Sequence, residues 1–320
     1  MARPVDEVRD VDRARRGEQR AVARLISLVE SGGPELAEVA AALAPHTGRA
    51  HVVGITGPPG VGKSTCTSAL VAALRAADRR VGVLAVDPSS PFSGGALLGD
   101  RVRMGEHATD NGVFIRSMAT RGHLGGLAWS TPQALRVLDA AGCDIVLIET
   151  VGVGQSEIEV VALADTTVVL LAPGMGDGVQ AAKAGILEVA DVFVVNKADR
   201  DGAVQTVRDL RHMISLGEPA EQRWRQPVLR TVAARGEGID ELVAALEEHR
   251  AWLDASGERE RRRLARAEAE IQALAMGQVR TRIADLAGAA ALTALAKRVV
   301  AGELDPYRAA DELLDALGGG

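Results

Sequence analysis

The sequence predicts an α/β fold in which helices flank a mostly parallel central sheet, with helical extensions at both ends. Two observations favour this class. Short apolar runs rich in Val, Ile and Leu alternate with longer helical stretches along residues 51–253. Glycine-rich or charged segments follow several of these runs, and the ends of the strands are where such a sheet carries its ligand chemistry.

The composition fits one large domain with additions, or two smaller domains. The chain has 320 residues; 47% are hydrophobic but only 2% aromatic, so small aliphatic side chains must fill the core. A net charge of −6 gives no indication of a nucleic-acid or anionic-membrane partner. The charged start is no secretory signal, and the apolar runs are too short to span a bilayer. With Cys66 and Cys143 lacking metal-ligand spacing, we expect a cytoplasmic protein.

Residues 1–49 are predicted to form an N-terminal helical extension. Apolar residues at helical spacing predict one helix over Val5–Glu30, and Gly32-Gly33 ends it. Pro34 suits the first turn of a second helix that runs to about Leu43. We expect the sheet domain to follow over residues 50–255.

The first predicted strand, His51–Thr56, leads into a phosphate-binding loop. Glycines let the loop turn its N–H groups toward anionic oxygens, and the helix that follows adds partial positive charge. Lys63 is expected to reach the β- and γ-phosphates, and the Ser64 hydroxyl to bind Mg²⁺. The alternative is a glycine turn with a surface lysine. The predicted nucleotide-binding residues of this segment are Gly57, Pro58, Pro59, Gly60, Val61, Gly62, Lys63, Ser64 and Thr65.

Two aspartates in the next part of the chain are candidate magnesium ligands. Arg80–Val86 is the second predicted strand, and Asp87 follows it at the level of the phosphates. A glycine-rich loop then leads to Asp100, which we place on the Mg²⁺ side of the site. The alternative for Asp100 is a helix cap at the protein surface.

A third predicted strand, Gly112–Met118, and a helix capped by Thr131 precede the fourth strand, Cys143–Ile148. In phosphate-loop hydrolases an acid at the end of this strand binds Mg²⁺, and a glycine N–H senses the γ-phosphate. Glu149 and Gly152 occupy these positions, although an acid that merely ends a strand is the alternative. Valine follows Gly152 where a water-positioning residue is common, which predicts slow intrinsic hydrolysis.

The fifth and sixth predicted strands, Thr166–Ala172 and Asp191–Val195, lead to a guanine-reading motif. An ionised Asp199 would accept hydrogen bonds from the ring N1–H and the 2-amino group of guanine. Adenine offers neither donor, so it would leave the carboxylate unpaired. Asn196 and Lys197 are expected to support the base and the phosphate loop.

The seventh predicted strand, Pro227–Val232, precedes a loop that we expect to contact guanine O6. The loop residues are Ala233, Ala234 and Arg235, and the backbone N–H is expected from Ala234. A helix from Ile239 to about Leu253 closes the domain.

The C-terminal segment, residues 256–320, is predicted to be helical. Its first part, Glu258–Glu270, is dense in Arg and Glu and suits a solvated helix. An apolar stripe follows, which so small a segment cannot bury alone; it must pack on the sheet domain or on another subunit. The stripe comprises Ile271, Leu274, Val279, Ile283, Leu286, Leu292, Leu295 and Val299.

These motifs together resemble the MeaB/ArgK family of GTPases, chaperones of adenosylcobalamin-dependent acyl-CoA mutases, chiefly methylmalonyl-CoA mutase. The most specific stretches are residues 87–104 and Glu149-Thr-Val-Gly-Val-Gly-Gln-Ser-Glu157. The resemblance implies a P-loop GTPase fold, GTP/GDP and Mg²⁺ as ligands, and a homodimer formed by the C-terminal helices. It also implies switch loops at 87–104, 149–161 and 172–183.

The resemblance assigns catalytic roles to Lys63, Asp100, Glu149 and Lys183, with Lys183 as the candidate that signals to the mutase. It assigns the metal to Ser64, Asp87, Asp100 and Glu149. Two positions depart from the family pattern: Gly178-Val179 lacks a second acid or polar residue, and Ala233 replaces a common Ser.

Two other function classes stay open. One is a metallocentre-assembly GTPase, a class that usually shows His-rich or Cys-x-x-Cys ligand sets, whereas the six histidines here are scattered. The other is a kinase linked to amino-acid transport. Which acyl-CoA mutase is the partner is also open at this point.

Overall fold

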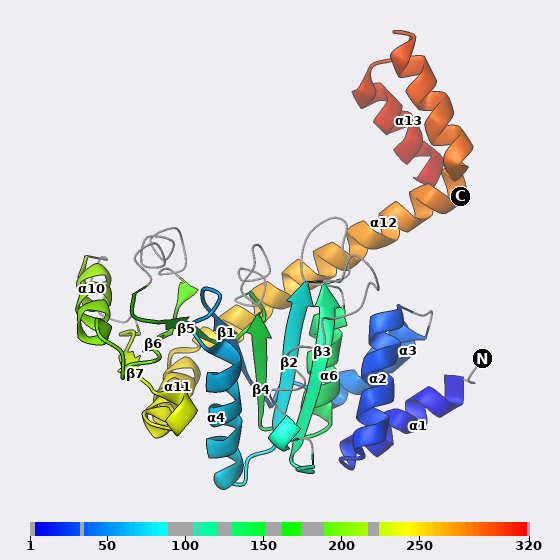
Figure 1. The fold of residues 1–320 in the computed structure, drawn as a ribbon. Coiled ribbons are helices and arrows are strands. Elements are labelled where there is room, and N and C mark those ends of the chain that lie inside the picture. The colour runs from blue at the N-terminus through cyan, green and yellow to red at the C-terminus, as the bar shows by residue number, and fades with distance from the viewer. Residues whose placement is uncertain are drawn as a thin grey trace. The chain divides into compact units, whose positions relative to one another are not determined.

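The computed structural model describes residues 4–32, 35–88, 105–107, 109–120, 130–150, 162–174, 189–216 and 224–318. The chain divides into two compact units, residues 1–259 and residues 260–320. The first unit holds the sheet and the helices around it (Figure 1).

A parallel seven-stranded sheet in the order β3-β2-β4-β1-β5-β6-β7 forms the centre of the first unit. This confirms the predicted α/β class. The seven predicted strands are all present, although β7 is shorter than expected because the chain turns away after Arg230 into the next loop. The strands are β1 (His51–Thr56), β2 (Val81–Pro88), β3 (Val113–Thr120), β4 (Ile145–Thr150), β5 (Thr166–Leu171), β6 (Val192–Val195) and β7 (Val228–Arg230).

Helices cover both faces of the sheet, and the alternation of strand side chains divides the core between them. In β4, Val146 and Ile148 face the core formed with the N-terminal helices and α6 (Ser130–Ala140). Leu147, from the same strand, faces the core formed with α4 (Lys63–Ala76) and α11 (Ile239–Ser256). A third cluster packs α10 (Ala203–Ser215) against β5 and β6. Short 3-10 turns lie at η2 (Gly105–His107) and η3 (Ala233–Arg235).

The N-terminal extension differs from the prediction. The single helix expected over Val5–Glu30 is wrong: α1 (Pro4–Arg15) and α2 (Gln19–Ser31) are separate helices. Gly17, between them, has a φ of 82°, and a Cβ atom there would lie 2.7 Å from the Arg80 guanidinium. The chain therefore turns at a glycine that the apolar periodicity does not reveal.

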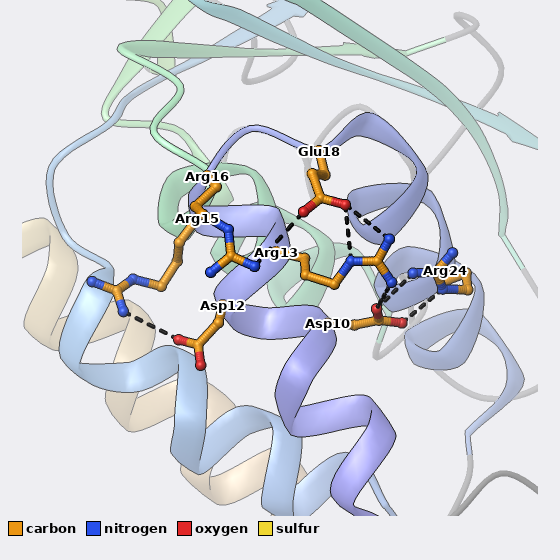
Figure 2. Close-up of polar contacts among 7 residues, drawn as sticks. All are labelled: Asp10, Asp12, Arg13, Arg15, Arg16, Glu18 and Arg24. Atoms are coloured by element: carbon orange, nitrogen blue, oxygen red, sulfur yellow. Dashed lines mark hydrogen bonds and ion pairs between the residues drawn. The ribbon is translucent and has the colours of Figure 1, made fainter.

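Ion pairs fix this turn. Asp10 of α1 accepts two hydrogen bonds from Arg24 of α2, at 2.7 and 2.6 Å (Figure 2). The hydrogen bond to Arg24 lowers the pKa of the Asp10 carboxyl. Together with α3 (Leu36–Leu43) and η1 (Ala44–His46), these helices cover one face of the sheet, so they belong to the first unit.

The second unit consists of most of α12 (Glu258–Val300) and of α13 (Pro306–Gly318). An ion pair of 2.6 Å between Arg298 and Glu312 joins the two helices. Large apolar side chains on α12 are exposed, among them Ile271 at 67% and Met276 at 54%. None of the described helices is long and apolar enough to cross a membrane.

Candidate functional site

The loop between β1 and α4 has the backbone geometry of a phosphate cradle. Gly57 and Gly62 have positive φ angles of 141° and 92°. A Cβ atom on Gly57 would lie 2.2 Å from the Leu170 carbonyl oxygen, and one on Gly62 would lie 2.6 Å from the Asn196 amide nitrogen. Both glycines are therefore required for the loop to pass so close to β5 and to the end of β6.

Lys63 is buried in this loop, with 6% of its surface exposed. Its ammonium donates hydrogen bonds to the carbonyl oxygens of Gly57 at 2.7 Å and Pro58 at 3.1 Å. The Lys63 carbonyl in turn accepts from the Thr67 hydroxyl at 3.0 Å. A fixed positive charge thus lies inside the loop, where it can meet phosphate oxygens.

Ser64 and Glu149 meet at the carboxyl edge of the sheet. The Ser64 hydroxyl donates to Glu149 Oε1 at 2.6 Å, and both side chains are buried. The register of β1 with β4, which pairs Ile55 with Glu149, brings them together from positions 85 residues apart. A hydroxyl and a carboxylate are hard oxygen donors, so this pair fits a magnesium ion.

The charge of Glu149 also affects the pKa of a neighbouring cysteine, Cys66. Burial, and then repulsion by Glu149, raises the pKa of the Cys66 thiol to about 12. Cys66 is therefore a small core residue and remains a neutral thiol at physiological pH.

Asn196 connects the phosphate loop to the opposite side of the site. Its amide nitrogen donates to the Val61 carbonyl at 2.9 Å. Its amide oxygen accepts from the Thr231 hydroxyl and from the Ala233 N–H, each at 3.1 Å. One buried side chain thus holds three segments in fixed positions.

Lys197 and Asp199 lie on the same turn. Lys197 has a positive φ of 56° and donates through Nζ to the Gly60 carbonyl at 2.6 Å, which adds a second tie to the phosphate loop. The Asp199 carboxylate, 37% exposed, accepts from Arg235 at 3.1 Å. An accessible carboxylate is therefore oriented by an arginine from the next loop, where a guanine base would meet it.

The structure thus brings most of the predicted nucleotide-binding residues to one edge of the sheet. Asp87 lies in β2, but the structure does not describe its side chain. The predicted site residues Asp100, Gly152 and Lys183 lie outside the described residues altogether. The Ala233 N–H is already used by Asn196, and the guanine contact of Ala234 stays a prediction. The sequence motifs did not identify Thr231 as a residue of the site. The only indication in the sequence was a hydroxyl side chain near the end of a predicted strand.

Comparison with known proteins agrees with this geometry. The chain matches the family model described as "Methylmalonyl Co-A mutase-associated GTPase MeaB" over residues 22–287. The chain belongs to the MeaB family. A putative GTPase of Pyrococcus abyssi is 47% identical over 99% of this chain and 98% of its own length. The GTPase ArgK of Escherichia coli is 39% identical over 77% of each chain.

A solved structure supports the fold as well. It is described as an LAO/AO transport system kinase and superposes with a TM-score of 0.72, at 26% identity and with 98% of each chain covered. This MeaB-family protein is a P-loop GTPase that hydrolyses GTP to GDP and phosphate.

Proposed function

We propose that this MeaB-family GTPase is a chaperone of an adenosylcobalamin-dependent acyl-CoA mutase, with methylmalonyl-CoA mutase as the partner. The observation that carries the proposal is the match of residues 22–287 to a family named for its association with that mutase. In this proposal the GTPase acts in the cytoplasm and gates loading of the mutase cofactor, and it protects or reactivates the mutase.

The proposed site uses this chain's own residues in distinct roles. Lys63 and the loop N–H groups bind the phosphates, and Asp199 selects guanine. Ser64, Asp87, Asp100 and Glu149 hold Mg²⁺, which when bound neutralises charge on the phosphates. The 2.6 Å contact of Ser64 with Glu149 supports this donor set.

Partner-stimulated turnover is the central expectation. Valine follows Gly152, so no residue at that position orients the attacking water, and hydrolysis by the GTPase alone should be slow. A docked mutase would supply this orientation and raise the rate. Because binding free energies are coupled in both directions, the nucleotide state would then also change the affinity for the mutase.

The test measures GTP turnover with and without purified methylmalonyl-CoA mutase, for the wild type, Lys183→Ala and the control Lys297→Ala. We expect at least a tenfold stimulation in the wild type and the control, and loss of stimulation in Lys183→Ala. Absence of stimulation with every acyl-CoA mutase of the source organism would refute the chaperone role. Full stimulation of Lys183→Ala would remove only Lys183 from the mechanism.

The two other classes make different predictions. A metallocentre-assembly GTPase would bind Ni²⁺ or Zn²⁺ stoichiometrically and respond to it in turnover. A kinase would transfer the γ-phosphate of GTP to an acceptor other than water. Isothermal titration with each metal and analysis of labelled phosphate products would separate these outcomes from the chaperone role.

A further inference from the structure

The first unit contains a hollow away from the nucleotide site. It has a volume of about 610 Å³, within the range of small-molecule sites. It lies where the strands of the sheet begin, since Arg49, Arg79 and Asp144 each precede a strand by a few residues. Its charged lining includes Arg16, Arg49, Arg79, Arg250, Asp139 and Asp144.

The lining carries five arginines against three aspartates. Two of these aspartates are committed to backbone donors. Asp139 accepts from the N–H groups of Gly48 at 2.5 Å, Arg49 at 3.2 Å and Ala50 at 2.9 Å. Asp144 accepts from the Arg80 N–H at 2.8 Å. These contacts fix the linker that carries Arg49, and they stabilise the two carboxylates without using a guanidinium.

Arg15 pairs with the third aspartate, Asp12, at 3.4 Å, whereas the other four arginines retain hydrogen-bonding capacity. In the part of the chain that the structure describes, no hydrogen bond or ion pair engages the guanidinium group of Arg49 or Arg250. Arg16 approaches Glu18 only to 3.7 Å, with a largely exposed side chain (Figure 2). Arg79 is likewise 3.7 Å from Glu247. Exposed pairs of this length contribute little, so both arginines can turn to another anion.

We propose that this hollow binds a small polyanion that carries phosphate groups. Guanidinium groups present planar pairs of N–H donors that match phosphate oxygens, and several of them converge here from α1, the linker before β1 and α11. The charged lining suits an anionic rather than an apolar ligand. A hollow of this volume admits a small molecule. We therefore favour a small molecule over a segment of another protein as the ligand.

The proposed site is separate from the phosphate loop. The hollow lies beside the residues that precede β1, whereas the phosphate loop follows its end at Thr56, about 20 Å along a six-residue strand. Both sites can therefore be filled together. The helix α11 begins just after the predicted guanine loop and carries Arg250 near its other end, so it spans the two sites.

The test titrates inorganic pyrophosphate into full-length protein saturated with GDP, so that the nucleotide site is already filled. Binding is measured by calorimetry for the wild type, Arg49→Gln/Arg250→Gln, and the exposed control Arg208→Gln. We expect saturable binding by the wild type and the control, with at least a tenfold loss in the double variant. Binding should weaken as salt is raised from about 0.05 M to about 0.5 M, because ions screen the charges.

Each other outcome overturns part or all of the proposal. Equal affinity of the double variant and the wild type, or no saturable binding to the GDP-filled protein, would refute the site. If citrate binds as tightly as pyrophosphate, the site does not select phosphate groups, and the proposed ligand class becomes polyanions in general. Because neither arginine contacts the nucleotide site, GDP affinity within twofold of the wild type shows that the variant is folded.

Discussion

We propose that the choice of nucleotide depends on Asp199. Its carboxylate is 37% exposed and is held by Arg235, while the neighbouring Lys197 ties the same turn to the phosphate loop. Replacing Asp199 with Asn should lower GTP affinity by about 100-fold, because two charge-assisted hydrogen bonds to guanine are lost. Xanthosine triphosphate should gain affinity, since its 2-oxo group can accept from the new amide.

Competition titrations with a fluorescent GDP analogue would measure both changes. Asp201→Asn, an exposed acid two residues away, is the matched control and should leave both affinities unchanged. If the wild type binds ATP and GTP equally, Asp199 does not read the base.

A buried histidine gives the first unit a pH-dependent stability. His51 Nε2 lies 2.7 Å from the Thr166 hydroxyl, which lies 2.8 Å from His249 Nδ1. Burial lowers the pKa of His51 to about 3, against the attraction of Asp165 and with the repulsion of Arg250, Arg259 and His249. His51 is therefore neutral in the native protein at any pH near neutrality.

The sign of the effect follows from the unfolded state. Below its ordinary pKa of about 6.5, His51 takes up a proton when unfolded but not when native, so stability falls as the pH falls from 6.5 toward 3. The slope contributed is at most about 1.4 kcal/mol per pH unit. Urea unfolding from pH 7 to 5 should show this slope in the wild type and in the exposed control His212→Gln. In His51→Gln, the slope of the unfolding free energy against pH should fall by the amount that one bound proton contributes. An unchanged slope would contradict the claim that His51 causes this pH dependence.

Single residues of the site can be predicted from the sequence, but the contacts that join them cannot. Lys63, Asn196 and Asp199 were identifiable because each belongs to a motif with fixed local spacing. The bond from Asn196 to Val61 spans 135 residues, and that from Ser64 to Glu149 spans 85. Such contacts depend on which strands are neighbours, and no local pattern specifies that order.

The junction of β1 and α4 depends on Gly57 more than on Gly60. Gly57 and Gly60 both have positive φ, but a Cβ on Gly57 would meet the Leu170 carbonyl at 2.2 Å, whereas nothing lies within 4 Å of one on Gly60. Gly60→Ala should cost about 1 kcal/mol, the penalty of a left-handed alanine. Gly57→Ala should cost about 2 kcal/mol more, because the loop must also move away from β5.

Urea unfolding of the nucleotide-free protein would measure both changes without the complication of altered phosphate binding. The two variants carry the same substitution in the same loop, so their difference reports the contact with β5 together with the different backbone angles of the two glycines, 141° and 78°. Equal stabilities would mean that the loop shifts without cost.

The elements were predictable where their hydrophobic pattern was unambiguous. The strands β1, β4 and β5 are buried along most or all of their length, and their continuous apolar runs revealed them. The break between α1 and α2 was not predictable, because buried Val11 and Ala14 precede it and Ala21 and Val22 follow it at helical spacing. The chain turns at Gly17, which has a positive φ, and Arg80, 63 residues farther along the sequence, fills the space that a side chain there would need.

The two units differ in how they bury apolar surface. The first has continuous cores on both faces of its sheet. In the second, Ile271, Met276 and Leu292 of α12 are more than half exposed. We propose that the segment 256–320 forms a homodimer through these residues, since a helix with so many exposed apolar side chains is expected to have a partner surface.

Light scattering of the full-length protein at micromolar concentration should therefore give the mass of a dimer. Truncation after Gly257 should give a monomer whose GDP affinity is within twofold of the full chain, because the described nucleotide-site residues lie at or before Arg235. In the full-length chain, Ile271→Glu/Met276→Glu should dissociate the dimer by burying charge, whereas the exposed control Glu268→Ala should not. A full-length monomer would refute the proposal, and a truncated dimer would move the interface to the first unit. Dissociation by the double variant with retained GDP binding would place the interface on α12 and leave each nucleotide site complete within one chain.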